Sequence, residues 1–453
     1  MPTDRVNLER WDREHVWHPF TPMQVYADET PLIIREGRGC TLIDLDGNEY
    51  LDGVSSLWCN VHGHRVEALD AAIRDQLALV AHSTLLGLAN VPSIRLARRL
   101  VEAAPPGLTR VFFSDDGATA VEVALKLAFQ FWQQSAATRK TKFLSLTMAY
   151  HGDTLGDVSV GDLGRFHNLF APLLFPTLHA PSPHCYRCPL GLKRETCKID
   201  CAEVLVEQVR ANADTLAAVI LEPIVQGAAG MITAPQGYLK RVREVTRECD
   251  VLLIADEVAV GFGRTGTQFA CEQEGVSPDF LCLSKGLTGG YMPLGATLTT
   301  ERVFAAFLGP PEAGRTFHHG HTYTGNPLGC AVALASLDLL QAPTGIAALP
   351  EKVARLSMWL DRLRDIPIVG DIRQRGMMVG VELVEDRESR RPFPPGRGMA
   401  RRVCRLCRER GVLLRPLGDV VVVMPPLAVS LEEIDRIGAT LEGAIRAVVE
   451  DIV

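Results

Sequence analysis

The chain has 453 residues, of which 47% are hydrophobic and 22% are charged, a composition typical of a globular protein. This length exceeds one ordinary hydrophobic core, so we expect two domains, or one large domain with appendages. The net charge of −7 does not indicate nucleic-acid or membrane binding, and no apolar run approaches the roughly 20 residues of a membrane span. Residues 1–20 are charged and lack the apolar core of a signal peptide, which predicts a cytoplasmic protein with mostly reduced cysteines.

The chain is predicted to form three regions. Residues 1–65 should be an N-terminal arm and the β-rich part of a small domain, with Asp46-Gly47 as a hairpin turn. Residues 66–344 should form one large domain, which includes amphipathic helices over 65–80 and 92–103. From about residue 345 to 453, helices alternate with strand-like runs broken by Gly and Pro, which predicts a smaller C-terminal α+β domain.

A strand, a turn and a helix are predicted in succession over residues 111–128. The turn covers Ser114 to Gly117, and helical spacing of apolar residues begins at Ala118. A helix N-terminus behind small residues offers free backbone N–H groups and a positive dipole end, so this turn is a candidate phosphate site. A plain capped turn is the competing interpretation.

Two apolar runs near the middle of the chain deliver polar side chains to one edge of a predicted sheet. Asp256 follows the strand predicted over 251–255, and Lys285 follows the strand over 280–283, 29 residues later. Pyridoxal phosphate needs such a pair, because a lysine amine forms a Schiff base with its aldehyde and a carboxylate keeps its pyridine nitrogen protonated. The competing interpretations are a helix-capping aspartate and a solvated loop lysine.

Other residues could complete such a cofactor site. Tyr150 lies just beyond a strand and could stack on the pyridine ring, although it could also be an ordinary loop tyrosine. Glu222 ends a third buried strand and suits the 3-hydroxyl side of the cofactor or a cation, unless it stays solvated. Thr322, in a glycine-punctuated loop, could reach a phosphate. Arg415 could bind a substrate carboxylate through its planar fork, or it could be a surface arginine.

Four of the 12 cysteines are closely spaced in one proline-containing loop. Cys185, Cys188, Cys197 and Cys201 could place four thiolates around zinc or an iron–sulfur centre. Reduced thiols in an insertion are the favoured interpretation, and we predict no metal that is essential for catalysis. Cys404 and Cys407, in an arginine-rich helix, are predicted to be structural.

Several motifs together resemble the class III pyridoxal-phosphate aminotransferases of fold type I over nearly the whole chain. They are YHGDT (150–154), GFGRTG (261–266) and HGHTYTGNP (319–327), together with Asp256 and Lys285. The resemblance implies an α/β fold, with a large domain whose mostly parallel sheet is flanked by helices and a smaller α+β domain. WHPFTPM (17–23), SSLW (55–58) and RPLGD (415–419) are similar to the diaminopelargonic acid synthases, which aminate 8-amino-7-oxononanoate to 7,8-diaminononanoate in biotin biosynthesis.

The resemblance implies cofactor-binding roles for several residues. Lys285 would be the Schiff-base lysine, Asp256 the partner of the pyridine nitrogen and Tyr150 the stacking ring. Gly117 and Ala118 would supply phosphate-binding amides, although the family usually has serine at the second position. Gly320, His321 and Thr322 would complete the phosphate site of a neighbouring subunit, which implies a homodimer with shared active sites.

The resemblance also implies the substrate contacts. Arg415 would hold the substrate carboxylate. Phe20 stands where many members have a tyrosine, and it lacks the hydroxyl through which that tyrosine contacts the oxononanoate. Leu57 replaces the first tryptophan of a common pair, and Trp58 keeps the second.

The predicted function is transamination in two half-reactions, with Lys285 as the general base. The implied partners are small molecules, namely the amino acceptor and an amino donor, which would be S-adenosylmethionine or lysine. The alternatives are an aminotransferase for another ω-amine or ω-amino acid, and a racemase, decarboxylase or aminomutase on the same cofactor. A non-catalytic metal-binding or redox module is a further alternative, but the intact lysine and aspartate argue against it.

Overall fold

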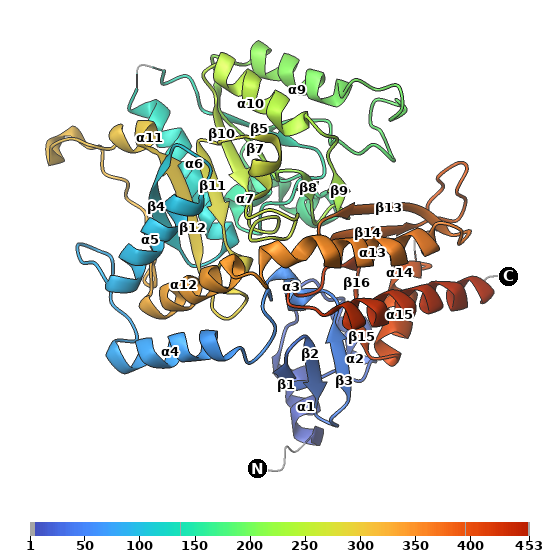
Figure 1. The fold of residues 1–453 in the computed structure, drawn as a ribbon. Coiled ribbons are helices and arrows are strands. Elements are labelled where there is room, and N and C mark those ends of the chain that lie inside the picture. Colours follow the sequence, from blue (N-terminus) through green and yellow to red (C-terminus); the bar gives the residue numbers. More distant parts are fainter. Residues whose placement is uncertain (1–4, 136, 395, 452–453) are drawn as a thin grey trace.

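The protein is built around a seven-stranded sheet in the order β4-β12-β11-β10-β7-β5-β6 (Figure 1). The structure, a computed structural model, describes residues 5–135, 137–394 and 396–451. β12 runs antiparallel to both of its neighbours, and the other pairs are parallel. The strands are β4 (Leu108–Ser114), β5 (Lys142–Leu146), β6 (Leu178–Ala180), β7 (Leu216–Leu221), β10 (Leu252–Asp256), β11 (Phe280–Leu283) and β12 (Gly295–Thr300).

Helices cover both faces of this sheet. The side chains of β10 alternate between two apolar cores: Leu252 and Ile254 face one, and Leu253 and Ala255 face the other. α6 (Gly117–Gln133) covers the first face, whereas α5 (Val91–Ala103), α9 (Asp200–Ala211), α10 (Tyr238–Glu248) and α12 (Pro327–Gln341) contribute to the core on the second. The mostly parallel sheet predicted for the large domain, with strands buried on both faces, is therefore confirmed.

Shorter elements complete this part of the chain. α4 (Glu67–Leu79) packs against α12 and confirms, with α5, the two helices predicted here. Other short elements are α3 (Ser55–Trp58), α7 (Leu155–Val160), α8 (Gly164–His167), α11 (Glu301–Ala305), and the two-stranded pair β8 (Val225–Gln226) and β9 (Ile232–Thr233). Single 3-10 turns, one of them at Lys285–Thr288, lie between them.

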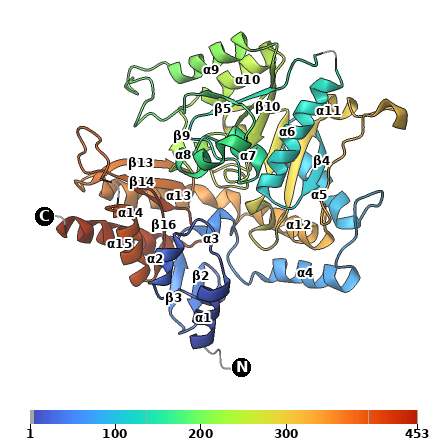
Figure 2. The ribbon, with the colours of Figure 1, turned by 180° about the vertical axis from the view of Figure 1, so that it is seen from behind.

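The N-terminal and C-terminal segments lie side by side, on the opposite side from α9 and α10 (Figures 1 and 2). β1 (Ile34–Arg38), β2 (Thr41–Asp44) and β3 (Glu49–Asp52) form a sheet with β15 (Val412–Leu413), and β2 and β3 are the predicted hairpin. A second sheet joins β13 (Val369–Arg375), β14 (Met378–Leu383), β17 (Val420–Val423) and β16 (Arg415–Leu417). The helices of this region are α1 (Arg5–His15), α2 (Met23–Ala27), α13 (Leu349–Leu363), α14 (Met399–Glu409) and α15 (Leu431–Glu450). The exact domain boundaries stay a prediction.

One stretch of the described chain, Pro327–Leu363, is long and apolar enough by composition to cross a membrane. It consists of α12 and α13, which are separate helices joined by residues 342–348. Leu337, Leu340, Leu356 and Leu360 are buried in the main apolar core. The stretch is therefore two separate helices that each contribute leucines to the core, not one continuous helix.

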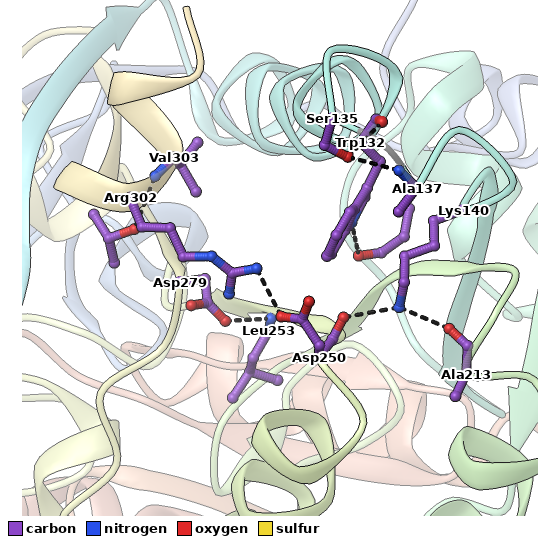
Figure 3. A network of polar contacts seen from close by, with 12 residues as sticks. Trp132, Ser135, Ala137, Lys140, Ala213, Asp250, Leu253, Asp279, Arg302 and Val303 are labelled. Carbon is purple, nitrogen blue, oxygen red and sulfur yellow. Dashed lines mark hydrogen bonds and ion pairs between the residues drawn. The ribbon is translucent and has the colours of Figure 1, made fainter.

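Polar contacts fasten the amino ends of the central strands (Figure 3). Lys140 Nζ donates to the carbonyls of Ala213 (2.7 Å) and Asp250 (2.8 Å), which precede β7 and β10. Arg302 binds the Asp250 carboxylate at 2.6 Å. Asp279 accepts from the backbone N–H of Leu253 at 2.8 Å and so joins β11 to β10. This network holds the strands in register from the edge opposite the predicted site.

Candidate active site

The carboxyl ends of the parallel strands bring the predicted site residues to one edge of the sheet. Asp256 is the last residue of β10, Lys285 lies two residues beyond β11, and Glu222 follows β7 directly. Tyr150 and His151 lie in the loop after β5. This is the edge at which open α/β sheets bind ligands.

Asp256 is buried and held in a fixed orientation. Its Oδ2 lies 2.7 Å from Nδ1 of His151, which is also buried, and its Oδ1 accepts from the backbone N–H of Val258 at 3.1 Å. The Asp256 side chain therefore contacts His151 and the loop after β10, and it does not cap a helix. His151 was not singled out from the sequence, because nothing in YHGDT shows that its ring turns toward β10.

Lys285 is partly buried and lies in a strained backbone conformation. Its φ of 44° falls in the left-handed region, where residues other than glycine are rare and cluster at functional sites. Its Nζ lies 5.2 Å from the centre of the Trp58 ring. Burial lowers the pKa of Lys285, while Asp256 and Glu222 oppose this shift. A lowered pKa favours the neutral, nucleophilic amine that a Schiff base requires.

A strained turn presents Leu57 and Trp58 beside the lysine. Ser55, Ser56 and Trp58 all have positive φ, of 53°, 60° and 64°. Asp52 stabilises the turn by accepting from the backbone N–H of Ser56 at 2.8 Å and from its hydroxyl at 3.0 Å. Asp52, which precedes the turn, therefore helps to hold its backbone in this conformation.

Arg264, from the GFGRTG motif, donates hydrogen bonds to backbone carbonyls in and after the same turn. It is 1% exposed, and its guanidinium donates to the carbonyls of Asn60 (2.8 Å), Trp58 (3.4 Å) and Pro425 (2.6 Å). Burial lowers the pKa of Arg264 to about 10. This positioning role was missed from the sequence, since the motif alone does not show which carbonyls the arginine reaches.

The start of α6 has the features of a phosphate site. Asp116 caps the helix by accepting from the backbone N–H of Thr119 at 2.8 Å. The N–H groups of Gly117 and Ala118 precede the first intrahelical donor, and neither has an acceptor among the described residues. A Cβ at Gly117 would lie 2.5 Å from Val258 Cγ1, so only glycine fits there.

The loop predicted to complete the phosphate site lies at the same end of α6. His321 Nδ1 is 3.2 Å from Oδ2 of Asp115, next to the helix cap. Gly320 and Thr322 are exposed in the single chain. Their predicted contact with the phosphate of a neighbouring subunit therefore stays a prediction.

Glu222 is buried rather than solvated. It accepts from the backbone N–H of Gly227 at 2.8 Å and of Tyr150 at 3.4 Å. Burial, together with the nearby Asp256 carboxylate, raises the pKa of Glu222 to about 7. Tyr150 is oriented by Asp153, to which its hydroxyl donates at 3.0 Å.

A cavity of about 820 Å³ opens in front of Lys285. Its lining includes the large apolar and aromatic side chains of Phe20, Leu57, Trp58 and Tyr150, together with Arg415. Arg415 is partly buried at the start of β16, and burial lowers its pKa, so it is not a surface arginine. Phe393 and Arg401 also line this cavity and were missed, since nothing in the sequence places these two residues beside Lys285.

The four clustered cysteines gather around one small pocket away from Lys285. Cys185, Cys188, Cys197 and Cys201 all line it, and all are free thiols. Among the residues that the structure describes, no three His, Cys, Asp or Glu side chains are arranged to hold a metal ion. Cys404 and Cys407 are buried in the core on α14.

These residues fit pyridoxal phosphate. The amine of Lys285 and the buried carboxylate of Asp256 lie at adjacent strand ends, and the unpaired amides of Gly117 and Ala118 offer donors to an anion. An amine, a carboxylate and an anion cradle at one sheet edge are the groups that this cofactor requires.

Comparison with known proteins agrees with this geometry. The family model for aminotransferase class III matches residues 23–445. The adenosylmethionine-8-amino-7-oxononanoate aminotransferase of Geobacter sulfurreducens is 52% identical over 448 residues, which cover 98% of each chain. The crystal structure of the enzyme with the same name from Methanocaldococcus jannaschii superimposes with a TM-score of 0.94 at 43% identity, covering 98% of this chain and 99% of that one. An omega transaminase from Pseudomonas jessenii in complex with PMP gives a TM-score of 0.94 at 32% identity, covering 98% of both chains. The chain therefore belongs to the class III aminotransferases, which are pyridoxal-phosphate enzymes of fold type I.

Proposed function

We propose that this chain transfers an amino group to 8-amino-7-oxononanoate and so forms 7,8-diaminononanoate, a step of biotin biosynthesis. The observation that carries the proposal is the cavity in front of Lys285, which is lined by large apolar side chains and by Arg415. An acceptor with a carboxylate, a long methylene chain and a distant ketone matches that combination of groups. The names of the relatives at 44–54% identity support the same substrate.

The cofactor, pyridoxal phosphate, supplies an electron sink that stabilises negative charge on the carbon bearing the transferred amino group. Asp256, held by His151, would pair with the pyridine nitrogen of the bound cofactor and favour its protonated form. Lys285 Nζ removes a proton from the donor carbon in the first half-reaction and delivers one to the acceptor carbon in the second.

The remaining residues position the reactants. The amides of Gly117 and Ala118 would hold the phosphate of the cofactor, and Tyr150 would stack on its ring. Arg415 binds the acceptor carboxylate through two parallel N–H donors. Phe20, Leu57 and Trp58 enclose the methylene chain and exclude water from the reacting carbon.

We infer S-adenosylmethionine as the amino donor, with lysine as the alternative. The relatives carry adenosylmethionine in their names. Leu57, however, offers no aromatic face to a sulfonium cation, a contact worth about 0.5–2 kcal/mol where it occurs. Single-turnover spectra with each donor at equal concentration separate the two, and rapid conversion by lysine alone would overturn the inference.

We further propose a cytoplasmic homodimer. Large apolar side chains are exposed on and after α4, including Leu79 (81%), Leu86 (89%) and Leu88 (64%). A second copy covering this surface would explain their exposure and would bring Thr322 to a neighbouring phosphate site. Free thiols at all described cysteines suit a reducing compartment. Sedimentation of the monomeric species alone at micromolar concentration would contradict the dimer.

The decisive assay for the acceptor is competition between 8-amino-7-oxononanoate and simple ω-amine acceptors. We expect the oxononanoate to have the higher kcat/KM, and Lys285→Ala serves as the inactive control. A preference for a simple ω-amine acceptor would instead favour the alternative aminotransferase activity.

A further inference from the structure

A second cavity adjoins the cavity in front of Lys285, and the roles above leave it unused. It has a volume of about 530 Å³, and Phe20, Arg401 and Arg415 line both cavities. Lys285 lines only the first cavity, whereas Arg405 lines only the second. The two cavities therefore meet at Arg401 and Arg415, and the second leads away from Lys285.

The walls of this second cavity come from α14 and from the N-terminal segment around α2, which lies beside it (Figure 2). α14 carries four arginines, and Glu409 is its one acidic residue. Arg401, Arg405 and Arg408 follow the spacing i, i+4, i+7, which places them on one face of the helix. All three line the second cavity, where they form what we call the arginine stripe.

The positive charge of the arginine stripe is largely unpaired. Arg401 and Arg408 form no ion pair with another described residue. Arg405 contacts Glu409 at 4.0 Å, and both side chains are exposed, so this contact contributes little. Glu29 is the one carboxylate among the described residues that line the second cavity. Because the chain carries a net charge of −7, the stripe is a local reversal of sign next to the active site.

Such a stripe acts on an anionic group before that group reaches Arg415. A cavity lined by charges of one sign focuses the electric field between its low-dielectric walls, and it raises the association rate of an oppositely charged ligand by about 10- to 1000-fold. The acceptor of the proposed reaction carries its carboxylate at one end and its ketone near the other. Attraction of the carboxylate to the stripe orients the chain so that the ketone points toward Lys285.

We propose that Arg401, Arg405 and Arg408 form an entry site, which attracts the carboxylate of the amino acceptor and orients the molecule before the carboxylate binds Arg415. Charges at the rim of a binding site act mainly on the association rate constant, kon, and on its salt dependence. The inference rests on the proposed function, because that function supplies an acceptor with a carboxylate. The test below uses binding without turnover, so the two proposals can fail separately.

The test measures the association of nonanoate with the holoenzyme by stopped-flow fluorescence. Nonanoate has the carboxylate and the chain length of the acceptor but no ketone, and Trp58 in the first cavity reports its binding. We expect kon of the parent to fall at least about fivefold between ionic strengths of about 0.01 M and 0.15 M, since the Debye length shortens from about 30 Å to about 8 Å. With Arg401, Arg405 and Arg408 all replaced by glutamine, kon at low salt should be about tenfold lower and should depend much less on salt.

Three controls separate attraction by charge from other effects. Replacing the same three arginines with lysine keeps the charge and should keep kon within about twofold of the parent. Arg410→Gln removes an exposed arginine at the end of α14 that lines neither cavity, so it should leave kon unchanged. Nonanamide has no charge and should bind the parent and all variants at the same rate.

Several results would overturn the entry site. An unchanged kon for nonanoate in the glutamine variant would show that the stripe does not attract the carboxylate. An equal loss of kon for nonanamide would assign the arginines a structural role, and a change confined to the dissociation rate would show that they hold the bound ligand instead. The salt dependence of the parent and the lysine variant decide the question even if the glutamine variant folds poorly. The expected nonanoate rates without amination of 8-amino-7-oxononanoate would support the entry site and contradict only the proposed acceptor.

Discussion

Replacing Asp256 with asparagine removes one negative charge from the end of β10 and keeps the side-chain shape. In the parent, the carboxylate is 4% exposed and paired with His151 at 2.7 Å, so water does not screen its charge. A neutral amide no longer favours the protonated pyridine nitrogen, and breaking a buried ion pair of this kind costs about 3–5 kcal/mol. Because each 1.36 kcal/mol is a tenfold change in rate, the donor half-reaction should slow by about two to four orders of magnitude.

The assay is the single-turnover rate at saturating cofactor, together with the thermal melting temperature. Asp279→Asn is the matched control, because Asp279 is also buried and ion-paired, to Arg243 at 2.6 Å, but lies at the opposite edge of the same sheet. The control should lose stability and keep its rate. A rate for Asp256→Asn within about twofold of the parent would refute the reasoning.

Three further changes test separate parts of the account. Arg415→Lys keeps the charge but loses the planar fork, so KM for the carboxylate-bearing acceptor should rise at least tenfold with little change in the donor half-reaction; equal effects on both halves would argue against carboxylate binding. Lys140→Met leaves the buried carbonyls of Ala213 and Asp250 without their donor and should cost about 1–3 kcal/mol of unfolding free energy without lowering kcat, which chemical denaturation checks. The pKa of Glu222 is about 7 in the fold and about 4.3 in an unfolded chain, so the fold binds the extra proton between these values and loses stability as the pH rises from about 4.5 to 7; Glu222→Gln should flatten this part of the melting profile, and an unchanged slope would contradict the raised pKa.

The central fold could be predicted because its signals are local. The run from Val251 to Ala255 is apolar at every position, as expected for a strand that is covered on both faces. The structure has β10 at Leu252–Asp256, shifted by one residue. The alternation of Leu252 and Leu253 between two cores follows directly from strand geometry. By contrast, the pairing of β3 with β15 joins segments about 360 residues apart, and no local pattern predicts such a contact.

Only those site residues that directly follow a strand could be predicted from the sequence. Lys285 and Asp256 stand directly after apolar runs, so their shared edge follows from the topology of parallel strands. Two other contacts could not be predicted, because they depend on the directions of side chains in loops. They are the contact of His151 with Asp256 and the hydrogen bonds of Arg264 to the turn at Trp58.

The most direct test of the proposed function is the transfer of nitrogen-15 from a labelled amino donor to 8-amino-7-oxononanoate. The account predicts 7,8-diaminononanoate that is one mass unit heavier, formed by the parent protein and not by Lys285→Ala. Product without the label, or labelled product from the Lys285→Ala variant at the parent rate, would contradict transamination through this lysine.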